Sequence, residues 1–274
     1  MVDSNTAPYP WGSAPGEWSL EEKRHARVRA LWAVMSASYF LSPHVHVCVA
    51  GKQVVLLDLE RDKYLALAHA HPVGRWVRGW PVLPSNSDGA LHGDDTPAPE
   101  NALLAKMISQ GLLVTDPSVG KEASPAATDA AKVSLVEYDI HVRPRTSFGQ
   151  LWNFFLAYAE AKWSLKYRPI GEVVRAARLR KRCVSPASAP DISTVRSLVT
   201  AFVHLRPLFY TARDACLLDS LTLTHFLARY GVFPTWVFGV KTEPFYPHCW
   251  IQQGDFVFND TPDYIRGFSP ILVV

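Results

Sequence analysis

Three side chains in the last quarter of the chain, those of Cys216, His248 and Asp260, have the chemistry for acyl transfer. Cys216 lies in the stretch ARDACLLDSL, which predicts a hydrophobic helix capped by Asp214, with Cys216 near position N2. The unpaired N–H groups and positive end of such a helix favour a thiolate, the nucleophilic form of cysteine. The same N–H groups could form an oxyanion hole. Helix position alone does not decide the matter, because free cysteines are often simply buried.

The other two residues are expected on neighbouring strands. His248 begins one strand and Asp260 ends the next, with a short turn centred on Gly254. A three-residue turn would set residues 248 and 260 opposite each other, with Cβ atoms about 5 Å apart. Asp260 would then accept from one ring nitrogen of His248 and orient the other toward Cys216. A two-residue turn would pair Cys249 with Asp260 and break the arrangement. Strand alternation directs Cys249 away from His248, so Cys249 is expected only to pack.

The composition limits the class of protein. The chain has 274 residues, 48% hydrophobic and 19% charged, which predicts about two domains with real cores. The net charge of +3 gives no reason to expect a nucleic-acid partner. No apolar run approaches the roughly 18 residues of a membrane span, so no membrane partner is expected. The four cysteines lack disulfide-framework spacing and the N-terminus does not read as a signal peptide, which indicates reduced thiols in a cytoplasm.

Metal and nucleotide cofactors are not expected. His44, His46 and Cys48 fall on one face of a predicted strand, but a fourth ligand at suitable spacing is missing. Residues repeating with period two are normal in strands. The sequence also contains no G-x-x-x-x-G-K-[ST] motif for a nucleotide phosphate.

The first half of the chain predicts a small α+β unit. Residues 1–34 are expected to be an accessory extension, which includes a helix capped by Ser19. Residues 35–115 contain short strands rich in β-formers and two helical stretches that would cover them. The expected strands are 44–50, 52–59 and 63–68, and the expected helices are 71–80 and 100–114. Residues 116–134, rich in Ala, Ser, Pro and Lys, predict a linker.

The second half, residues 135–274, predicts helices followed by antiparallel strands, which is again an α+β order. The expected helices are 147–163, 170–182, 191–205 and 214–230, and the expected strands are 235–240, 248–252 and 256–260. The second of these helices ends in a basic run, which consists of Arg175, Arg178, Arg180, Lys181 and Arg182. Such a run could be a phosphate or nucleic-acid patch, but we expect a solvated helix end favoured by the helix dipole.

The catalytic-looking residues lie within a motif string. ARDACLLDSLTLTHFLARYGVFPTWVFGV, followed by PFYPHCWIQQGDFVFND, resembles the transglutaminase-like cysteine proteases, and among them the B proteins of lasso-peptide biosynthesis. The motif positions are Cys216, Leu217, Ser220, Gly231, Gly239, Val240, His248, Trp250, Asn259 and Asp260. The resemblance implies a transglutaminase-like, papain-like fold in which Cys216 is the nucleophile, His248 the base and Asp260 the orienting carboxylate. His-Ala-Trp is the commoner form in the family, so Cys249 is a departure.

The first half carries a second resemblance. YFLSPHVHVCVAGKQVVLLDLERDKYLAL, with LLAKMISQGLLV after it, resembles the PqqD-like, winged-helix-like element that recognises precursor peptides. The resemblance implies binding of a leader peptide. A three-stranded meander has an exposed edge to which an extended peptide can add as a further strand. Candidate leader-binding residues, each of which is as well explained as ordinary core, are Tyr64, Leu65, Leu67, Leu103, Leu104 and Met107.

Together the resemblances imply a leader peptidase without a cofactor. It would bind the leader of a ribosomally made precursor, cut leader from core, and hand the core to an ATP-dependent macrolactam synthetase. Two alternatives stay open. Acyl transfer to an amine, as in true transglutaminases, uses the same acyl-enzyme. A non-catalytic adaptor would only escort the precursor to the synthetase, and the presence of Cys216, His248 and Asp260 at compatible positions argues against it.

Overall fold

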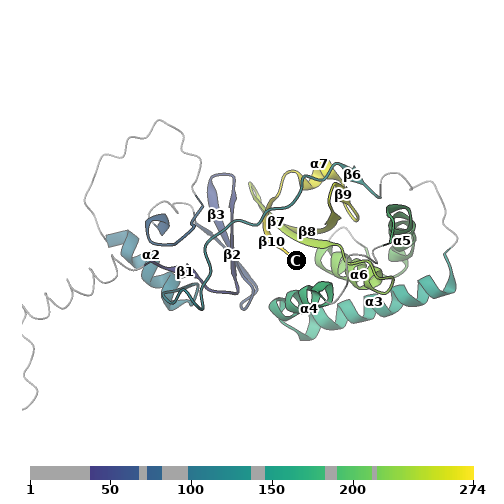
Figure 1. Cartoon of the computed structure of the whole chain (residues 1–274), viewed down its shortest axis with the longest axis horizontal. Helices are drawn as coiled ribbons and strands as arrows, with labels where there is room; N and C mark the ends of the chain where they lie inside the picture. Colours follow the sequence, from purple (N-terminus) through teal and green to yellow (C-terminus); the bar gives the residue numbers. More distant parts are fainter. Residues whose placement is uncertain (1–37, 68–72, 82–97, 137–145, 183–189, 212–214) are drawn as a thin grey trace, which may run out of the picture. The chain divides into compact units, whose positions relative to one another are not determined.

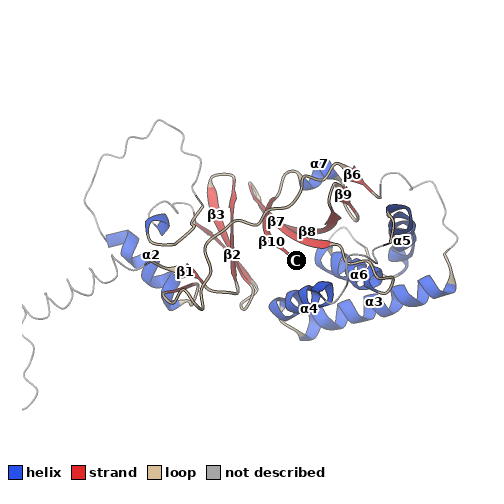
Figure 2. Ribbon diagram, viewed as in Figure 1, coloured by secondary structure: helices blue, strands red, loops and turns tan. Residues whose placement is uncertain are grey.

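A computed structural model describes residues 38–67, 73–81, 98–136, 146–182, 190–211 and 215–274 (Figure 1). The expected extension over residues 1–34, with its helix, lies outside the described residues. Tyr39–Val274 form one compact unit. This unit contains both α-helices and β-sheets, which agrees with the helices and strands predicted from the sequence (Figure 2).

A three-stranded antiparallel meander dominates the first half, in the order β2-β3-β4. Its strands β2 (Val45–Ala50), β3 (Gln53–Asp58) and β4 (Lys63–Leu67) confirm the three predicted strands. The β2–β3 turn uses Gly51, whose φ of +57° suits a residue without a Cβ. β4 is an edge strand among the strands that the structure describes, since it pairs only with β3 there.

The helices around this meander match the prediction only in part. α2 (Ala98–Ser109) confirms the second predicted helix and ends before Gly111, at φ +67°. The first predicted helix, 71–80, is wrong over its described residues, which contain only the short 3-10 turn η1 (Val73–Arg75). Gly74 and Gly79 explain the difference, because glycine is a poor helix former and Gly79 adopts φ +73°. A small pair, β1 (Phe40–Leu41) and β5 (Leu113–Val114), completes this half.

One face of the meander packs against residues from the second half of the chain. Cys48, Val55 and Leu57 belong to the same hydrophobic cluster as Phe226 and Phe238. Thr242 also donates a hydrogen bond of 3.2 Å to the Ala50 carbonyl. The two halves therefore share a core.

The segment that composition predicts as a linker runs along this unit. Over residues 115–132 it contains no helix, and Ala123 within it is fully buried. Lys121 and Leu41 exchange two backbone hydrogen bonds of 2.9 Å. The segment leads into β6 (Val133–Ser134), which pairs in parallel with β9. Backbone pairing thus holds both its ends.

Helices fill most of the chain between residues 148 and 228. They are α3 (Phe148–Tyr167), α4 (Ile170–Arg182), α5 (Ile192–Leu205) and α6 (Cys216–Ala228), with the 3-10 turn η3 (Arg206–Leu208) after α5. The predicted cap Asp191 accepts from the Thr194 N–H at 3.4 Å. α6 packs against α3 on one side and β8 on the other, so it is the central helix (Figure 1). None of the described helices has both the length and the apolar character that crossing a bilayer requires.

A five-stranded sheet of order β10-β7-β8-β9-β6 supports these helices. Its predicted members are β7 (Thr235–Thr242), β8 (Phe245–Gln253) and β9 (Phe256–Val257), while β6 and β10 (Ser269–Val273) were not predicted. A short helix, α7 (Pro262–Ile265), links β9 to β10. Gly239 in β7 lies against the Trp250 ring, where a Cβ would come within 2.8 Å of a ring carbon. A glycine there lets the strand approach the tryptophan beside His248.

Candidate active site

The candidate nucleophile occupies the first position of the central helix. α6 begins at Cys216, and its N-cap is Ala215, which makes no side-chain cap hydrogen bond. The predicted cap Asp214 lies outside the described residues. Cys216 is therefore at N1 rather than near N2. Its side chain is half-buried, while Ser220 and Leu221 on the following turn are buried.

His248 and Asp260 form a close pair beside this helix end. Nε2 of His248 lies 2.5 Å from Oδ2 of Asp260, and their side chains are only 10% and 16% exposed. The buried Nδ1 of His248 has no hydrogen-bond partner of standard geometry among the described residues. The Cys216 thiol is close enough to the ring to raise the pKa of His248. The structure thus brings the three sequence-predicted residues together.

The strand register differs from the expected one. Gln252 pairs with Val257 and Gln253 with Phe256, so the turn has two residues, one of them Gly254 at φ +54°. Continued along the ladder, this register would set Asp260 opposite Cys249. The expected three-residue turn is therefore wrong, and so is the expectation that a two-residue turn separates Asp260 from His248.

A bend after β9 explains how the pair still forms. β9 ends at Val257, and the side chain of Asn259 replaces the backbone by accepting from the Ile251 N–H at 2.9 Å. Asn259 also donates to the Asp219 carboxylate and to the Ser220 hydroxyl, both at 3.0 Å. These bonds tie the bend to α6 and turn Asp260 toward the ring.

The charges of the site favour a thiolate and an imidazolium. Hydrogen bonding from Cys249, together with the hydrogen bond and charge of His248, lowers the pKa of Cys216 to about 4, against the opposing effect of burial. Burial alone would lower the pKa of His248, but hydrogen bonds and charge from Asp260 and Cys216 raise it to about 9. Between these two values the sulfur is negative and the ring is positive.

Cys249 does more than pack. It is 3% exposed, and its sulfur lies 3.7 Å from the Ser220 hydroxyl oxygen. Burial raises the pKa of Cys249 well above its ordinary value, and the neighbouring Cys216 adds to the effect. Cys249 is therefore a neutral thiol next to an ionised one. The expectation that it only packs is wrong, because Cys216 at the helix head reaches the strand on the side where Cys249 points.

Sequence reasoning missed the buried carboxylate of Asp219. It is 3% exposed and accepts from Asn259 at 3.0 Å, from the Tyr210 hydroxyl at 2.9 Å and from Arg206 at 3.3 Å. Tyr210 is therefore turned to Asp219. The available signal was the spacing, since a polar residue three positions after Cys216 lies on the same side of the helix.

Two hollows meet at the candidate nucleophile. A polar groove of about 420 Å³ is lined by Cys216 and His248 and also by Arg206, Asn259 and Tyr264. A second, apolar pocket of about 150 Å³ shares Cys216 and His248 but continues between the two halves of the chain. The sulfur is thus open to solvent and to a ligand from two sides.

The six candidate leader-binding residues do not form one surface. Tyr64 pairs with Leu57 and lines the apolar pocket beside Cys216. Strand alternation places Leu65 and Leu67 on the opposite face of β4, where both are half-buried. On α2, Leu103 is half-buried, whereas Leu104 and Met107 are each 2% exposed.

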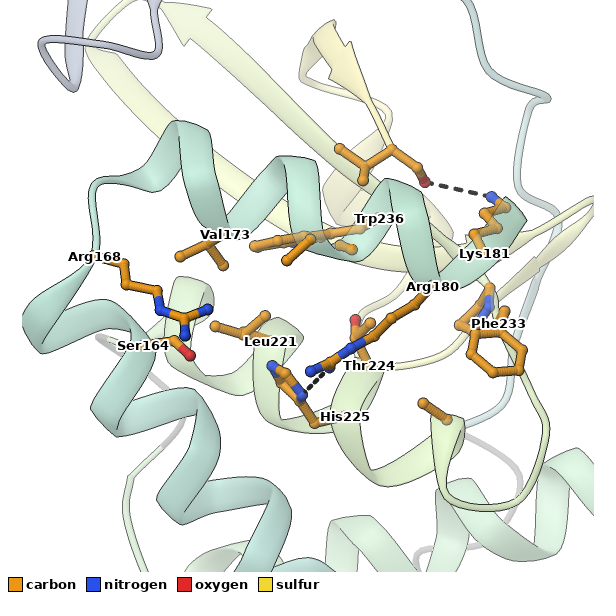
Figure 3. Close-up of a pocket in the computed structure, with 15 residues that line it drawn as sticks. Ser164, Arg168, Val173, Arg180, Lys181, Leu221, Thr224, His225, Phe233 and Trp236 are labelled. Carbon is orange, nitrogen blue, oxygen red and sulfur yellow. Dashed lines mark hydrogen bonds between the residues drawn. The ribbon is translucent and has the colours of Figure 1, made fainter. Parts of the chain in front are cut away.

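A second histidine–carboxylate cluster lies near the other end of α6, and Figure 3 shows its His225 and Arg180. Nδ1 of His225 lies 2.6 Å from Arg180 and 3.2 Å from Glu160, and Arg180 also pairs with Glu160. Lys181 reaches the Val274 carbonyl at 3.3 Å. At the basic end of α4, Arg180 is exposed as expected, although it also pairs with Glu160, whereas Lys181 is half-buried and joins α4 to its neighbours.

Comparisons with known proteins support the placement of these residues. Residues 155–273, which include Cys216, His248 and Asp260, match the family model of the transglutaminase-like superfamily. The microcin J25-processing protein McjB of Escherichia coli is 36% identical over 59 residues, which are 22% of this chain and 28% of that protein. No solved structure matches the chain. The similarity to the transglutaminase-like superfamily therefore covers the part of the chain that contains all three candidate residues.

Proposed function

We propose that this chain is a cysteine peptidase that removes the leader from a ribosomally made lasso-peptide precursor. One observation carries the proposal: Asp260 lies 2.5 Å from Nε2 of His248, and this imidazole interacts with the Cys216 thiol at the head of a buried helix and lines the same groove. The transglutaminase-like match supports thiol chemistry. The similarity to a microcin-processing protein supports a peptide precursor as substrate.

In the proposed reaction the Cys216 thiolate attacks the carbonyl carbon that joins leader to core. The imidazolium of His248 gives its Nδ1 proton to the departing amine of the core, the C–N bond breaks, and the leader remains on sulfur as a thioester. Neutral His248 then takes a proton from water, which attacks the thioester and releases the leader acid. Asp260 holds the ring in the required tautomer throughout. Neither step uses a cofactor.

The developing oxyanion needs hydrogen-bond donors near the sulfur. The first N–H groups of α6, from Cys216 onward, lack partners within the helix because they precede its first complete turn. We assign them the role of the oxyanion hole.

The first half of the chain would bind the leader. We propose that residues 35–115 act as a PqqD-like element, to whose edge strand β4 the leader adds by backbone hydrogen bonds. Leu65, Leu67 and Leu103 are half-buried and would receive leader side chains. Leu104 and Met107 are too deeply buried to contact a peptide without rearrangement, and serve as core.

Tethering makes weak recognition at the sulfur sufficient. A leader held on β4 presents its scissile bond to Cys216 at an effective concentration of about a millimolar. The released core, with its new amino terminus, would pass to an ATP-dependent macrolactam synthetase as the partner enzyme.

Mass spectrometry of a candidate precursor tests the proposal. The purified chain should convert it into leader and core, while Cys216→Ala should still bind the precursor but leave it intact. The matched control is Cys48→Ala, which removes a buried thiol remote from the groove and should retain cleavage.

The alternatives give different masses. A peptidase yields a leader that ends in a free acid. A transglutaminase-like acyl transferase yields a leader amide when a primary amine is supplied in place of water. Cleavage that persists in Cys216→Ala would overturn the assigned nucleophile, and binding without cleavage by the unaltered chain would favour the adaptor.

A further inference from the structure

The apolar pocket beside Cys216 is built by both halves of the chain. Leu57, Leu59 and Tyr64 come from the meander, and Ile170, Leu217 and Phe238 come from the transglutaminase-like half. Its volume is about 150 Å³, and Cys216 and His248 form its inner end. The pocket is therefore continuous with the reacting sulfur.

Close packing fixes the wall contributed by the meander. Gly171, at the start of α4, lies so near this wall that a Cβ there would come within 3.0 Å of the Leu59 carbonyl oxygen. The Tyr64 ring makes an edge-to-face contact with Phe245 at a centroid distance of 5.8 Å. Burial raises the pKa of Tyr64, with smaller effects from the nearby Cys249 and Asp62, so its hydroxyl stays neutral. These contacts make a wall whose position is set before any ligand arrives.

The size of the pocket indicates what fits it. An apolar cavity of about 150 Å³ holds a group the size of benzene and does not retain water well. Protein interiors seldom leave such volumes unfilled, because the lining loses dispersion contacts. An aliphatic or phenyl side chain would fill it, whereas the Asp62 carboxylate on its lining disfavours an acidic one.

We propose that this pocket is a specificity subsite, which accepts a branched aliphatic or phenyl side chain flanking the bond that Cys216 attacks. The inference rests on the proposed function only in taking Cys216 as the nucleophile. It assigns the meander a role besides leader binding, since Leu59 and Tyr64 would select residues at the cleavage site itself. Leader and cleavage site would then be read by the two faces of one small sheet.

Alkylation of Cys216 tests the subsite without any precursor. The probes are iodoacetamide, N-isobutyl-iodoacetamide and N-carboxymethyl-iodoacetamide, and each rate at pH 6 is divided by the rate with N-acetylcysteine. We expect the isobutyl reagent to react about tenfold faster than iodoacetamide, since burying an apolar group of this size is worth about that factor. The carboxymethyl reagent should be slower than both.

Variants of the pocket residues test whether the preference for the isobutyl reagent arises in this pocket. Leu59→Phe should fill the pocket and abolish the isobutyl preference, and Tyr64→Ala should enlarge it and shift the preference toward an N-benzyl reagent. Tyr64→Phe keeps the ring and should keep the preference. The matched control is Lys63→Ala on the same strand, because Lys63 is exposed and does not line the pocket. Thermal melts confirm that each variant is folded, and Tyr64→Ala decides if Leu59→Phe does not fold.

The outcomes separate the two proposals. Fast alkylation of Cys216 at pH 6 with equal relative rates for all reagents would overturn the subsite and leave the nucleophile assignment standing. A thiol no more reactive than N-acetylcysteine toward every reagent would overturn the nucleophile assignment, and the subsite would fall with it.

Discussion

The two histidine–carboxylate clusters at the ends of α6 differ in what surrounds the histidine ring on the side away from the carboxylate. At the head of the helix, His248 has Asp260 on one side, a thiol on the other and an open groove of about 420 Å³ around it. Near the far end, His225 has Glu160 and Arg180 on one side, and its Nε2 has no hydrogen-bond partner among the described residues. The cavity there is only about 30 Å³ (Figure 3).

The comparison teaches that a histidine beside a carboxylate is not by itself a catalytic site. A cavity of about 30 Å³ has room for about two water molecules and none for a peptide. Hydrogen bonding from His225, with help from Arg180 and against the effect of burial, lowers the pKa of Glu160 to about 2. This cluster therefore joins α3, α4 and α6, whereas the other cluster has the groove and the neighbouring thiol that our proposed function requires.

Removing each ring is the most severe test of this contrast. His248→Ala should lower kcat/KM for precursor cleavage about 10³-fold or more, because the thiolate loses both its counter-ion and the acid that protonates the leaving amine. His225→Ala should leave kcat/KM within about twofold of the unaltered chain. It should instead lower the free energy of unfolding by about 1–3 kcal/mol, since the buried His225 ring and its interactions with Glu160 and Arg180 are lost. Urea unfolding and steady-state kinetics measure the two effects, and a catalytic defect in His225→Ala would erase the contrast.

Removing each carboxylate charge should give a smaller effect, visible in the pH dependence. With pKa values of about 4 for Cys216 and about 9 for His248, the ion pair exists between these limits, so alkylation by iodoacetamide should already be near its plateau at pH 6. Asp260→Asn removes an effect that raises the pKa of His248. The imidazolium then loses its proton at lower pH, so the basic limb of the pH profile of kcat/KM for precursor cleavage, which needs the imidazolium as acid, should move downward by about one pH unit, while the acid limb set by Cys216 stays in place.

Glu160→Gln is the matched control for this shift. It removes the carboxylate of the other cluster, and neither limb of the pH profile of kcat/KM should move. An unchanged profile in Asp260→Asn would mean that Asp260 does not act on the ring, whatever the distance between them.

Sequence patterns found the parts of this site but not the way in which the chain joins them. Helices α3, α4 and α5 and the strands of the meander follow from periodicity and caps, which are local properties. The pairing of His248 with Asp260 depends instead on a side chain, that of Asn259, which replaces the backbone where β9 ends. A register argument that assumes a continuous ladder cannot find such a bend.

The remaining differences are also tertiary in origin. β6 and β10 are short, and they form strands because they pair with β9 and β7. Their sequences alone therefore contain little signal for a strand. Arg180 carries a charge that favours solvent in isolation, and only the folded chain brings Glu160 and His225 within its reach. The role of Cys249 depends on where α6 begins, one position later than the caps predict.

The neighbour of the nucleophile should give the smallest effect. Cys249→Ala removes the thiol whose hydrogen bond lowers the pKa of Cys216, but leaves His248 and Asp260 in place. The pKa of Cys216 should rise while staying below its ordinary value, because the imidazolium remains. Alkylation at pH 5 should therefore slow severalfold, while the rate at pH 8 should be unchanged. Cys48→Ala, which removes a buried thiol away from α6, should alter neither rate. A uniform loss at both pH values in Cys249→Ala would mean that Cys249 acts through packing, whereas a loss confined to low pH identifies it as a hydrogen-bond donor to the thiolate.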